Sequence, residues 1–192
     1  MKYPSGVKKE YNKVKSYDNR GMDLEEDINI SNEYYLLNDI AVIYKKPTPI
    51  QINKVDFKSR RDATITEAHF KIPSTTDYNG IYKGYYIDFE AKETNSLTSF
   101  PLSNIHKHQI EHLKRIMKHG GIGFIIVKFT KLNKTYILYI EDLLDFINNE
   151  ERKSIPLSLF NEKGILLKEG INPRYDYLKV IDERIKYEKE IN

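Results

Sequence analysis

The segment from Ser74 to Thr94, STTDYNGIYKGYYIDFEAKET, constrains the fold more than any other part of this chain. Its second half, residues 85–92, alternates strictly between two kinds of side chain. Side chains on a strand point to opposite faces in turn, so this pattern predicts a strand with one face packed on a core. The core-facing set is Tyr85, Ile87, Phe89 and Ala91, and the opposite set is Tyr86, Asp88, Glu90 and Lys92.

Two turn signals precede this strand, and they predict different sites. A turn at Asn79-Gly80, the stronger hairpin signal, separates Asp77 from Glu90 by about 25 Å along the strand. A turn at Lys83-Gly84 instead places Asp77 directly opposite Glu90, with Lys92 on the same face. Only this second register brings two carboxylates together.

Two carboxylates at cross-strand distance suit Mg²⁺, which prefers oxygen ligands and keeps several waters. A lysine beside that metal can position an attacking water or stabilise charge on a phosphate. The alternative is an exposed strand face with ordinary solvated charges. Asp88 lies on the same face but two residues from Glu90, so we hold it as an outer candidate only.

Charge is distributed unevenly although the formal net charge is only +3. Residues 1–20 and 45–71 are each basic, and the acidic residues 21–39 lie between them. This arrangement suits a metal-dependent enzyme that acts on a polyphosphate, although solvated charge runs are the alternative for each segment. The chain has no cysteine, which excludes disulfides and thiolate metal sites. No apolar run is long enough for a membrane span, so we expect a cytoplasmic, nucleoid-associated protein.

Hydrophobic periodicity and turn residues predict an α/β chain without internal repeats. The expected elements are a helix over 21–38, a strand over 40–44, extended segments over 50–57 and 63–72, a helix over 105–118, strands over 123–129 and 135–140, and helices over 141–149 and 174–186. The segment 155–170 is expected to be irregular.

Glu25 and Gln109 are candidate supporting residues. Glu25 lies next to the apolar stripe of the first helix and could lean toward the sheet, or it could simply complement the helix dipole in solvent. Gln109 falls on the apolar stripe of its helix, where it either bonds to backbone or orients a water or phosphate. The histidines of that helix, which include His108 and His112, lack the spacing of a zinc site and are interpreted as surface residues.

The extended segments over 50–72 are interpreted as a projecting β-hairpin, because the prolines of Lys45-Lys46-Pro47-Thr48-Pro49 take the chain out of the sheet. Its tip carries Arg60 and Arg61, whose guanidinium groups suit phosphate contact. Lys45 and Lys46 at its base are further candidate contacts to a phosphate backbone. The alternative is a hairpin loop with ordinary surface charges.

Seven short segments, in order along the chain, resemble those of one known family. They are NRGM (19–22), AVIYKKPTP (41–49), TTDYNG (75–80), YIDFEAKET (86–94), TSFPL (98–102), HQIEH (108–112) and PRYDY (173–177). On these residues the chain resembles RecU, the Holliday junction resolvases of Gram-positive bacteria. Asp77 and Glu90-Ala91-Lys92 look like the PD-(D/E)xK nuclease core.

The resemblance implies a restriction-endonuclease-like fold, with a mixed central sheet flanked by helices. The length of the chain predicts a single domain over 1–192, and residues 1–19, which are basic and lack periodicity, are interpreted as a flexible arm. The resemblance implies that this domain is a nuclease and that the stalk over 50–72 enters the junction. The implied catalytic residues are Asp77, Glu90, Lys92, Gln109 and Glu25. The implied ligands of Mg²⁺, or of Mn²⁺, are Asp77, Glu90 and the Ala91 carbonyl.

The implied activity is symmetric nicking of four-way junctions in recombination and repair, by a homodimer whose two-fold symmetry matches the junction. A RecA-type recombinase is an implied partner. The alternative function is a non-catalytic module that binds or anneals branched DNA and modulates a recombinase. A nuclease specific for a duplex sequence shares the chemistry but leaves the basic projection unexplained.

Overall fold

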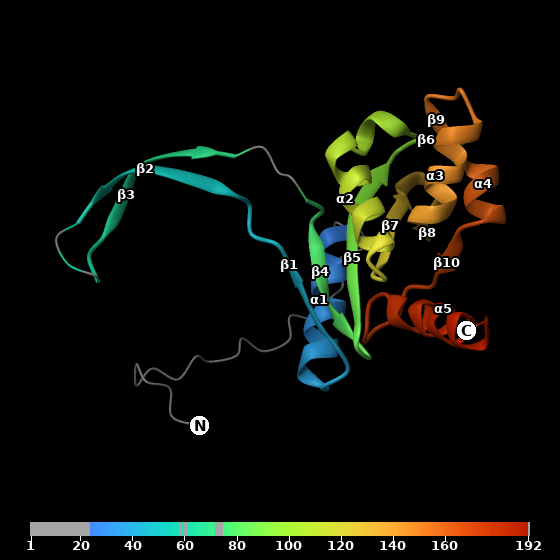
Figure 1. Cartoon of the computed structure of the whole chain (residues 1–192), viewed down its shortest axis with the longest axis horizontal. Helices are drawn as coiled ribbons and strands as arrows, with labels where there is room; N and C mark the ends of the chain where they lie inside the picture. The colour runs from blue at the N-terminus through green and yellow to red at the C-terminus, as the bar shows by residue number, and fades with distance from the viewer. Residues whose placement is uncertain (1–23, 58, 60, 72–74, 192) are drawn as a thin grey trace.

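A six-stranded mixed sheet forms the centre of the computed structural model, which describes residues 24–57, 59, 61–71 and 75–191 (Figure 1). Its strand order is β1-β4-β5-β7-β8-β10; β5 and β7 run parallel, and the other neighbours are antiparallel. The helices and strands are α1 (Leu24–Leu37), β1 (Val42–Lys45), β2 (Ile50–Asp56), β3 (Thr64–Phe70), β4 (Tyr78–Tyr82), β5 (Tyr85–Thr94), β6 (Ser99–Pro101), η1 (Leu102–Asn104), α2 (Lys107–Lys118), β7 (Ile122–Phe129), η2 (Thr130–Leu132), β8 (Lys134–Tyr139), α3 (Ile140–Asn149), β9 (Ser154–Pro156), α4 (Leu157–Glu162), β10 (Ile165–Leu167) and α5 (Tyr177–Ile191).

Helices cover both faces of the sheet, and each face has its own apolar core. One core lies under α1 and α5 and includes Ile28, Phe89 and Ile181. The other lies under α2, α3 and α4. Strand β7 feeds alternate side chains into both cores, which explains why all of its residues are buried. The mixed sheet flanked by helices confirms the predicted fold class.

The polar face of β5 is the face that α2 partly covers. Ile87, Phe89 and Ala91 enter the core beneath α1 and α5, as the alternation predicts. The intervening Asp88 and Glu90 are completely buried even though they lie on the opposite face. Buried carboxylates are costly unless they are paired or bind a cation, so this face of the sheet needs a chemical explanation.

The hairpin β2–β3 projects from the sheet and forms a separate two-stranded ribbon (Figure 1). Every residue of its two strands is exposed, and two register shifts near Asn53 and Lys54 interrupt the pairing. Such irregularities bend and twist a ribbon. The predicted projecting hairpin is therefore confirmed for residues 50–56 and 64–70, and we call it the stalk.

The other predicted helices and strands are present, and most of them begin or end a few residues from the predicted positions. The predicted irregular segment 155–170 contains β9, α4 and β10, which are too short to produce a clear periodicity. The short strand β6, for which no element was predicted, pairs with β9. The predicted arm at 1–19 lies outside the described residues. Within the described part of the chain, no helix is both long enough and apolar enough to span a membrane.

Candidate active site

The hairpin of β4 and β5 turns at Lys83-Gly84. Tyr82 pairs with Tyr85, and the ladder continues to Tyr78 opposite Phe89. Lys83 and Gly84 both have positive φ, at 50° and 85°. Two consecutive positive φ values are typical of the type I′ turn, which matches the twist of a two-residue hairpin. The register that brings the carboxylates together is confirmed.

Asn79-Gly80 lies inside β4 rather than in a turn, and the packing of Gly80 gives the reason. A Cβ atom at Gly80 would lie 2.1 Å from the carbonyl oxygen of Val42 and 2.6 Å from Cα of Ile43. Glycine is therefore needed here for the close approach of β1 to β4.

Asp77 and Glu90 meet at the open end of this hairpin. The backbone N–H of Asp77 donates to Oε2 of Glu90 across 3.0 Å. Nζ of Lys92 forms an ion pair with Oε1 of Glu90 at 2.5 Å. The alternation of β5 points both side chains to the same face, and the short turn places Asp77 there too.

Burial is the largest influence on the pKa of Glu90. Burial, reinforced by the neighbouring carboxyl of Asp77, raises the pKa of Glu90 to about 7, although Lys92 acts in the opposite direction. A carboxyl that is hard to ionise next to another acid is typical of a site where two carboxylates share a cation.

The residues present fit a divalent metal ion. Oε1 of Glu90 is buried, and the Lys92 ammonium 2.5 Å away is the cation that faces it in this structure. A carboxylate that already faces a cation, with the carboxylate of Asp77 close by as a second hard oxygen donor, is the kind of donor set that a divalent metal ion prefers. In the described part of the chain, no three His, Asp or Glu side chains form a ready cluster of ligands. Two carboxylates with a backbone carbonyl and waters suit Mg²⁺, which usually keeps several waters.

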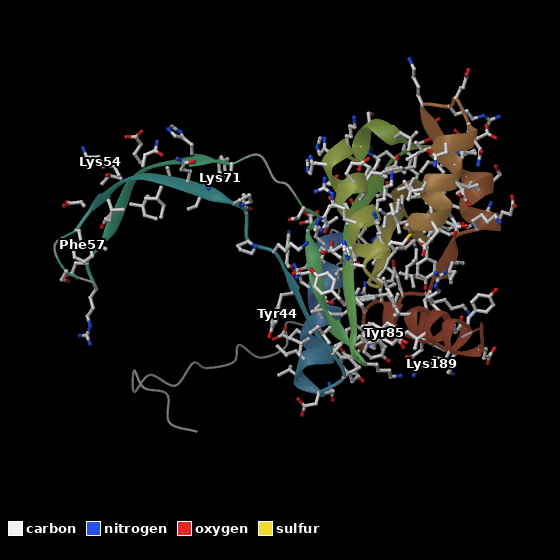
Figure 2. The ribbon with its side chains drawn as sticks, viewed as in Figure 1. Tyr44, Lys54, Phe57, Lys71, Tyr85 and Lys189 are labelled. Atoms are coloured by element: carbon white, nitrogen blue, oxygen red, sulfur yellow. The ribbon has the colours of Figure 1, made fainter. Side chains whose placement is uncertain are left out.

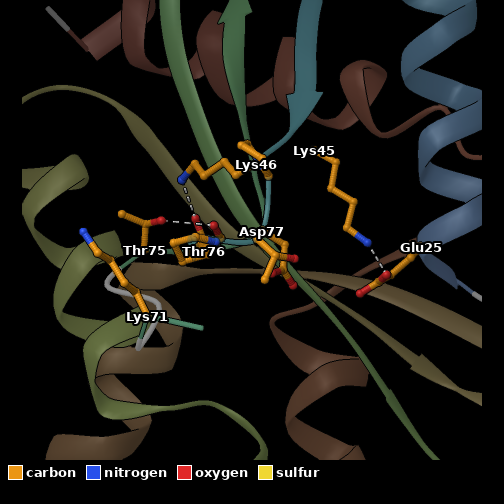
Figure 3. A pocket seen from close by; sticks show the side chains of 10 residues that line it. Glu25, Lys45, Lys46, Lys71, Thr75, Thr76 and Asp77 are labelled. Atoms are coloured by element: carbon orange, nitrogen blue, oxygen red, sulfur yellow. Dashed lines mark hydrogen bonds and ion pairs between the residues drawn. The ribbon is translucent and has the colours of Figure 1, made fainter. Parts of the chain in front are cut away.

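A cavity of about 390 Å³ opens beside Asp77 at the root of the stalk (Figure 3). Glu25 reaches this cavity from α1 and forms an ion pair with Lys45. The hydroxyl of Tyr78, the residue after Asp77, donates to the backbone carbonyl of Glu25 across 3.2 Å. The first helix is thus fastened beside the carboxylates, and Glu25 lies at the edge of the site. The residues that line the cavity are Glu25, Lys45, Lys46, Pro47, Thr48, Pro49, Lys71, Thr75, Thr76 and Asp77.

Known proteins match this chain along almost its whole length. The family model described as "RecU: Recombination protein U" matches residues 19–183. The chain belongs to the RecU family. Its relatives include the Holliday junction resolvase RecU of Bacillus cereus strain B4264, which is 50% identical over 95% of this chain and 96% of its own length. The same named proteins of Bacillus anthracis strain CDC 684 / NRRL 3495 and Bacillus thuringiensis subsp. konkukian strain 97-27 are each 51% identical over the same shares.

A solved structure, the Holliday junction resolvase Hjc of Archaeoglobus fulgidus, also matches. It is 12% identical, with a TM-score of 0.42 over 74% of this chain and 92% of that chain.

Gln109 has a defined place in this RecU chain. It is buried on α2, and its Oε1 accepts a hydrogen bond from the backbone N–H of His106 across 2.9 Å. The side chain therefore closes the first turn of the helix by bonding to a free backbone donor. Of the two roles expected for Gln109, this contact is the bond to backbone, and it involves Oε1. The catalytic role that the RecU resemblance implies for Gln109 stays a prediction.

The two lysines at the root of the stalk have acidic partners within the chain. Lys45 pairs with Glu25, and Nζ of Lys46 lies 2.9 Å from Oδ2 of Asp88. Lys46 also donates to the hydroxyl of Thr76 across 3.0 Å. The prediction that these lysines contact DNA did not anticipate such partners, because they lie far away in sequence.

One interpretation from sequence is wrong. His112 is not a simple surface residue of α2, since its Nε2 lies 3.0 Å from Oδ2 of the buried Asp88. The periodicity of a helix indicates which residues face the sheet, but it cannot indicate a polar partner on a strand 24 residues earlier. The rings of His106 and His108 stack 5.4 Å apart beside an open groove that His112 also lines.

The tip of the stalk points away from the sheet. Arg61 is exposed there, while Arg60 lies outside the described residues. Figure 2 shows Phe57 and Lys54 on the stalk, well apart from Tyr44 and Tyr85 on the sheet. Exposed cations on a slender projection can reach a nucleic-acid backbone without competition from neighbouring parts of the chain.

Proposed function

We propose that this chain is a Mg²⁺-dependent endonuclease that nicks four-way DNA junctions symmetrically. The observation that carries the proposal is the meeting of Asp77 and Glu90 with Lys92 at the end of the β4–β5 hairpin. The relatives at 50% and 51% identity are named Holliday junction resolvases, which supports the junction as substrate. A resolvase acts on chromosomal DNA, so we place this one with the nucleoid in the cytoplasm.

In this proposal, the carboxylates of Asp77 and Glu90 and the carbonyl of Ala91 hold Mg²⁺, or Mn²⁺ in its place. The bound metal supplies a Lewis acid for the phosphate and lowers the pKa of a water. Lys92 is the chain's own cation at the site. It lies close enough to Glu90 to position the attacking water or to stabilise charge on the phosphate oxygens.

Supporting residues complete the site. We assign the amide nitrogen of Gln109 to the attacking water or the scissile phosphate, while its carbonyl oxygen accepts from the backbone N–H of His106 at the start of α2. Glu25 balances the charge of Lys45 at the cavity edge. We assign Arg60 and Arg61 to the DNA backbone at the junction centre, because the stalk-root lysines already have acidic partners.

Two matched cuts require two active sites related by a two-fold axis, so we propose a homodimer. The whole chain from 1 to 192 then acts as one nuclease domain with an inserted stalk. A RecA-type recombinase remains a proposed partner on the basis of the family resemblance.

The test uses a four-way junction labelled on each strand in turn. With Mg²⁺, the protein is expected to produce paired nicks on opposite strands, and with EDTA it is expected to bind without cutting. A linear duplex with the same arm sequence should stay intact. Binding of the junction without cuts in Mg²⁺ or Mn²⁺ would instead establish the alternative, a structure-selective DNA-binding module.

A further inference from the structure

Asp88 is a completely buried carboxylate with four partners. Its Oδ2 accepts from Nζ of Lys46 across 2.9 Å and from the hydroxyl of Tyr86 across 3.0 Å, and Nε2 of His112 lies 3.0 Å from the same atom. Its Oδ1 accepts from the hydroxyl of Thr76. We call these five residues the Asp88 cluster.

The partners come from separate segments that also carry the proposed catalytic residues. Thr76 directly precedes Asp77, and His112 follows Gln109 by three residues on α2. Residues three apart on a helix lie on the same side, so the His112 contact holds the helix face that carries Gln109. Asp88 itself lies two residues before Glu90 on β5. One carboxylate therefore joins three of the segments that build the site.

The stalk root is joined to the same carboxylate. Lys46 directly precedes Pro47, where the chain leaves the sheet toward the stalk. The backbone N–H of Lys46 also donates to the carbonyl of Asp77 across 2.7 Å. The Lys46 side chain thus fixes the place where the stalk begins relative to the metal-binding hairpin.

Both carboxylate oxygens of Asp88 already have hydrogen-bond partners within the chain. Lys46, His112 and Tyr86 surround Oδ2, and Thr76 bonds Oδ1. A buried carboxylate is tolerated when hydrogen bonds and an opposite charge compensate its lost hydration, and all of these are present. Its role must therefore be exerted through the groups that it holds.

We propose that Asp88 is a positioning residue, which fixes the Asp77 segment and helix α2 on the catalytic strand so that the metal ligands keep their geometry. This proposal rests on the proposed function. Residues that orient metal ligands typically change metal affinity or activity 10–100-fold when they are substituted. Asp88 should therefore control metal affinity and cutting rate, and it should have little influence on junction affinity, because it is buried away from solvent.

The test compares Asp88→Asn with wild type. Asparagine has the same shape and can still accept hydrogen bonds from Lys46 and Tyr86, but it lacks the charge. We expect Mn²⁺ binding, measured by calorimetry without DNA, to weaken about 10–100-fold, with a similar fall in the single-turnover cutting rate at fixed metal. Junction affinity in EDTA should stay unchanged.

Asp182→Asn is the matched control. Asp182 accepts from the hydroxyl of Tyr82 across 3.0 Å and from Nζ of Lys83 across 2.6 Å. Its substitution therefore also removes a carboxylate that is bonded to a tyrosine and a lysine. Asp182 is on α5, and its partners Tyr82 and Lys83 are at the turn end of the same hairpin, away from Glu90. This variant should lose some thermal stability and keep the wild-type Mn²⁺ affinity.

His112→Ala tests whether the cluster acts as a unit. Its loss of Mn²⁺ affinity should not add to that of Asp88→Asn in the double variant, since both changes break the same network. Lys114→Ala, an exposed position on the same helix, should have no effect.

Two results would overturn the proposal. One is an Asp88→Asn protein that binds Mn²⁺ and cuts like wild type. The other is an equal loss of Mn²⁺ affinity in Asp182→Asn, which would mean that any softening of the hairpin is sufficient. If the wild type binds Mn²⁺ without cutting junctions, the proposed function fails, while the Mn²⁺ affinities still decide the role of Asp88.

Discussion

The backbone N–H of Asp77 donates to the Glu90 carboxylate across the β4–β5 hairpin, at 3.0 Å. The bond belongs to the main chain of Asp77 and leaves its carboxylate available. A substitution of the side chain therefore removes a candidate metal ligand and keeps the contact that aligns the two strands. This relationship allows chemistry and folding to be tested separately at one position.

Asp77→Ala and Lys92→Ala should each lower junction cutting by at least about 100-fold, because each removes a group that acts on the developing charge or on its metal. Junction affinity, measured by gel shift in EDTA, should remain close to wild type. If binding and cutting are lost together with the folded circular dichroism spectrum, these residues build the fold instead.

Arg60→Ala combined with Arg61→Ala should weaken junction binding and flatten its salt dependence. Each lost phosphate contact lowers the slope of log affinity against log salt by about 0.9, so the double variant should lose about 1.8. Lys179→Ala with Lys186→Ala removes two exposed cations from α5, on the side of the sheet away from the stalk (Figure 1), and should leave the slope unchanged. An unchanged slope in the arginine variant would remove the stalk from the DNA surface.

Gly80→Ala should destabilise the protein more than Gly84→Ala. The first adds a methyl group against the backbone of β1 and should cost about 3 kcal/mol or more of unfolding free energy. At the second position only the positive φ is strained, since a Cβ there meets nothing within 4 Å, and the cost should be about 1–2 kcal/mol. Urea denaturation of the metal-free proteins measures both. The reverse order would mean that the chain turns at Asn79-Gly80.

The metal-free protein should lose stability as the pH rises toward and through 7. The pKa of Glu90 is about 7 in the folded state and near its ordinary value of 4.5 when unfolded. Between these values the folded state holds a proton that the unfolded state has released, so the free energy of unfolding falls by roughly 1–3 kcal/mol from pH 5 to pH 8.

Glu90→Gln should remove this pH dependence, and calorimetric unfolding at a series of pH values checks it. Mg²⁺ competes with the same proton, so its affinity for wild type should rise across this pH range. A pH-independent metal affinity would contradict the assignment of Glu90 as a ligand.

Strand alternation predicted which residues of the β4–β5 hairpin share a face, but turn propensity did not predict how the hairpin packs against β1. Alternation along β5 was sufficient to place Glu90 and Lys92 on one face. The position of the turn could not be predicted from Asn79-Gly80, because Gly80 is a glycine for another reason. It lets β1, a strand from a different part of the chain, approach β4 closely. Propensity alone favoured the wrong dipeptide, because it does not include contacts between distant strands.

The Asp88 cluster shows the same limit. Lys46, Thr76 and His112 are separated from Asp88 by 42, 12 and 24 residues. Only the fold brings them together, so no spacing rule could find them. The Gln109 contact to His106, in contrast, spans three residues and belongs to a known helix-start pattern that the sequence could have indicated.

The stalk is a ribbon without an interior. Isolated two-stranded hairpins are only marginally stable in water, and both strands here leave one side of their backbone unpaired. Its amino acids are therefore free of the packing demands that restrict β5 or β7. Selection can reshape this ribbon to suit the geometry of what it touches without disturbing the machinery to which it is attached.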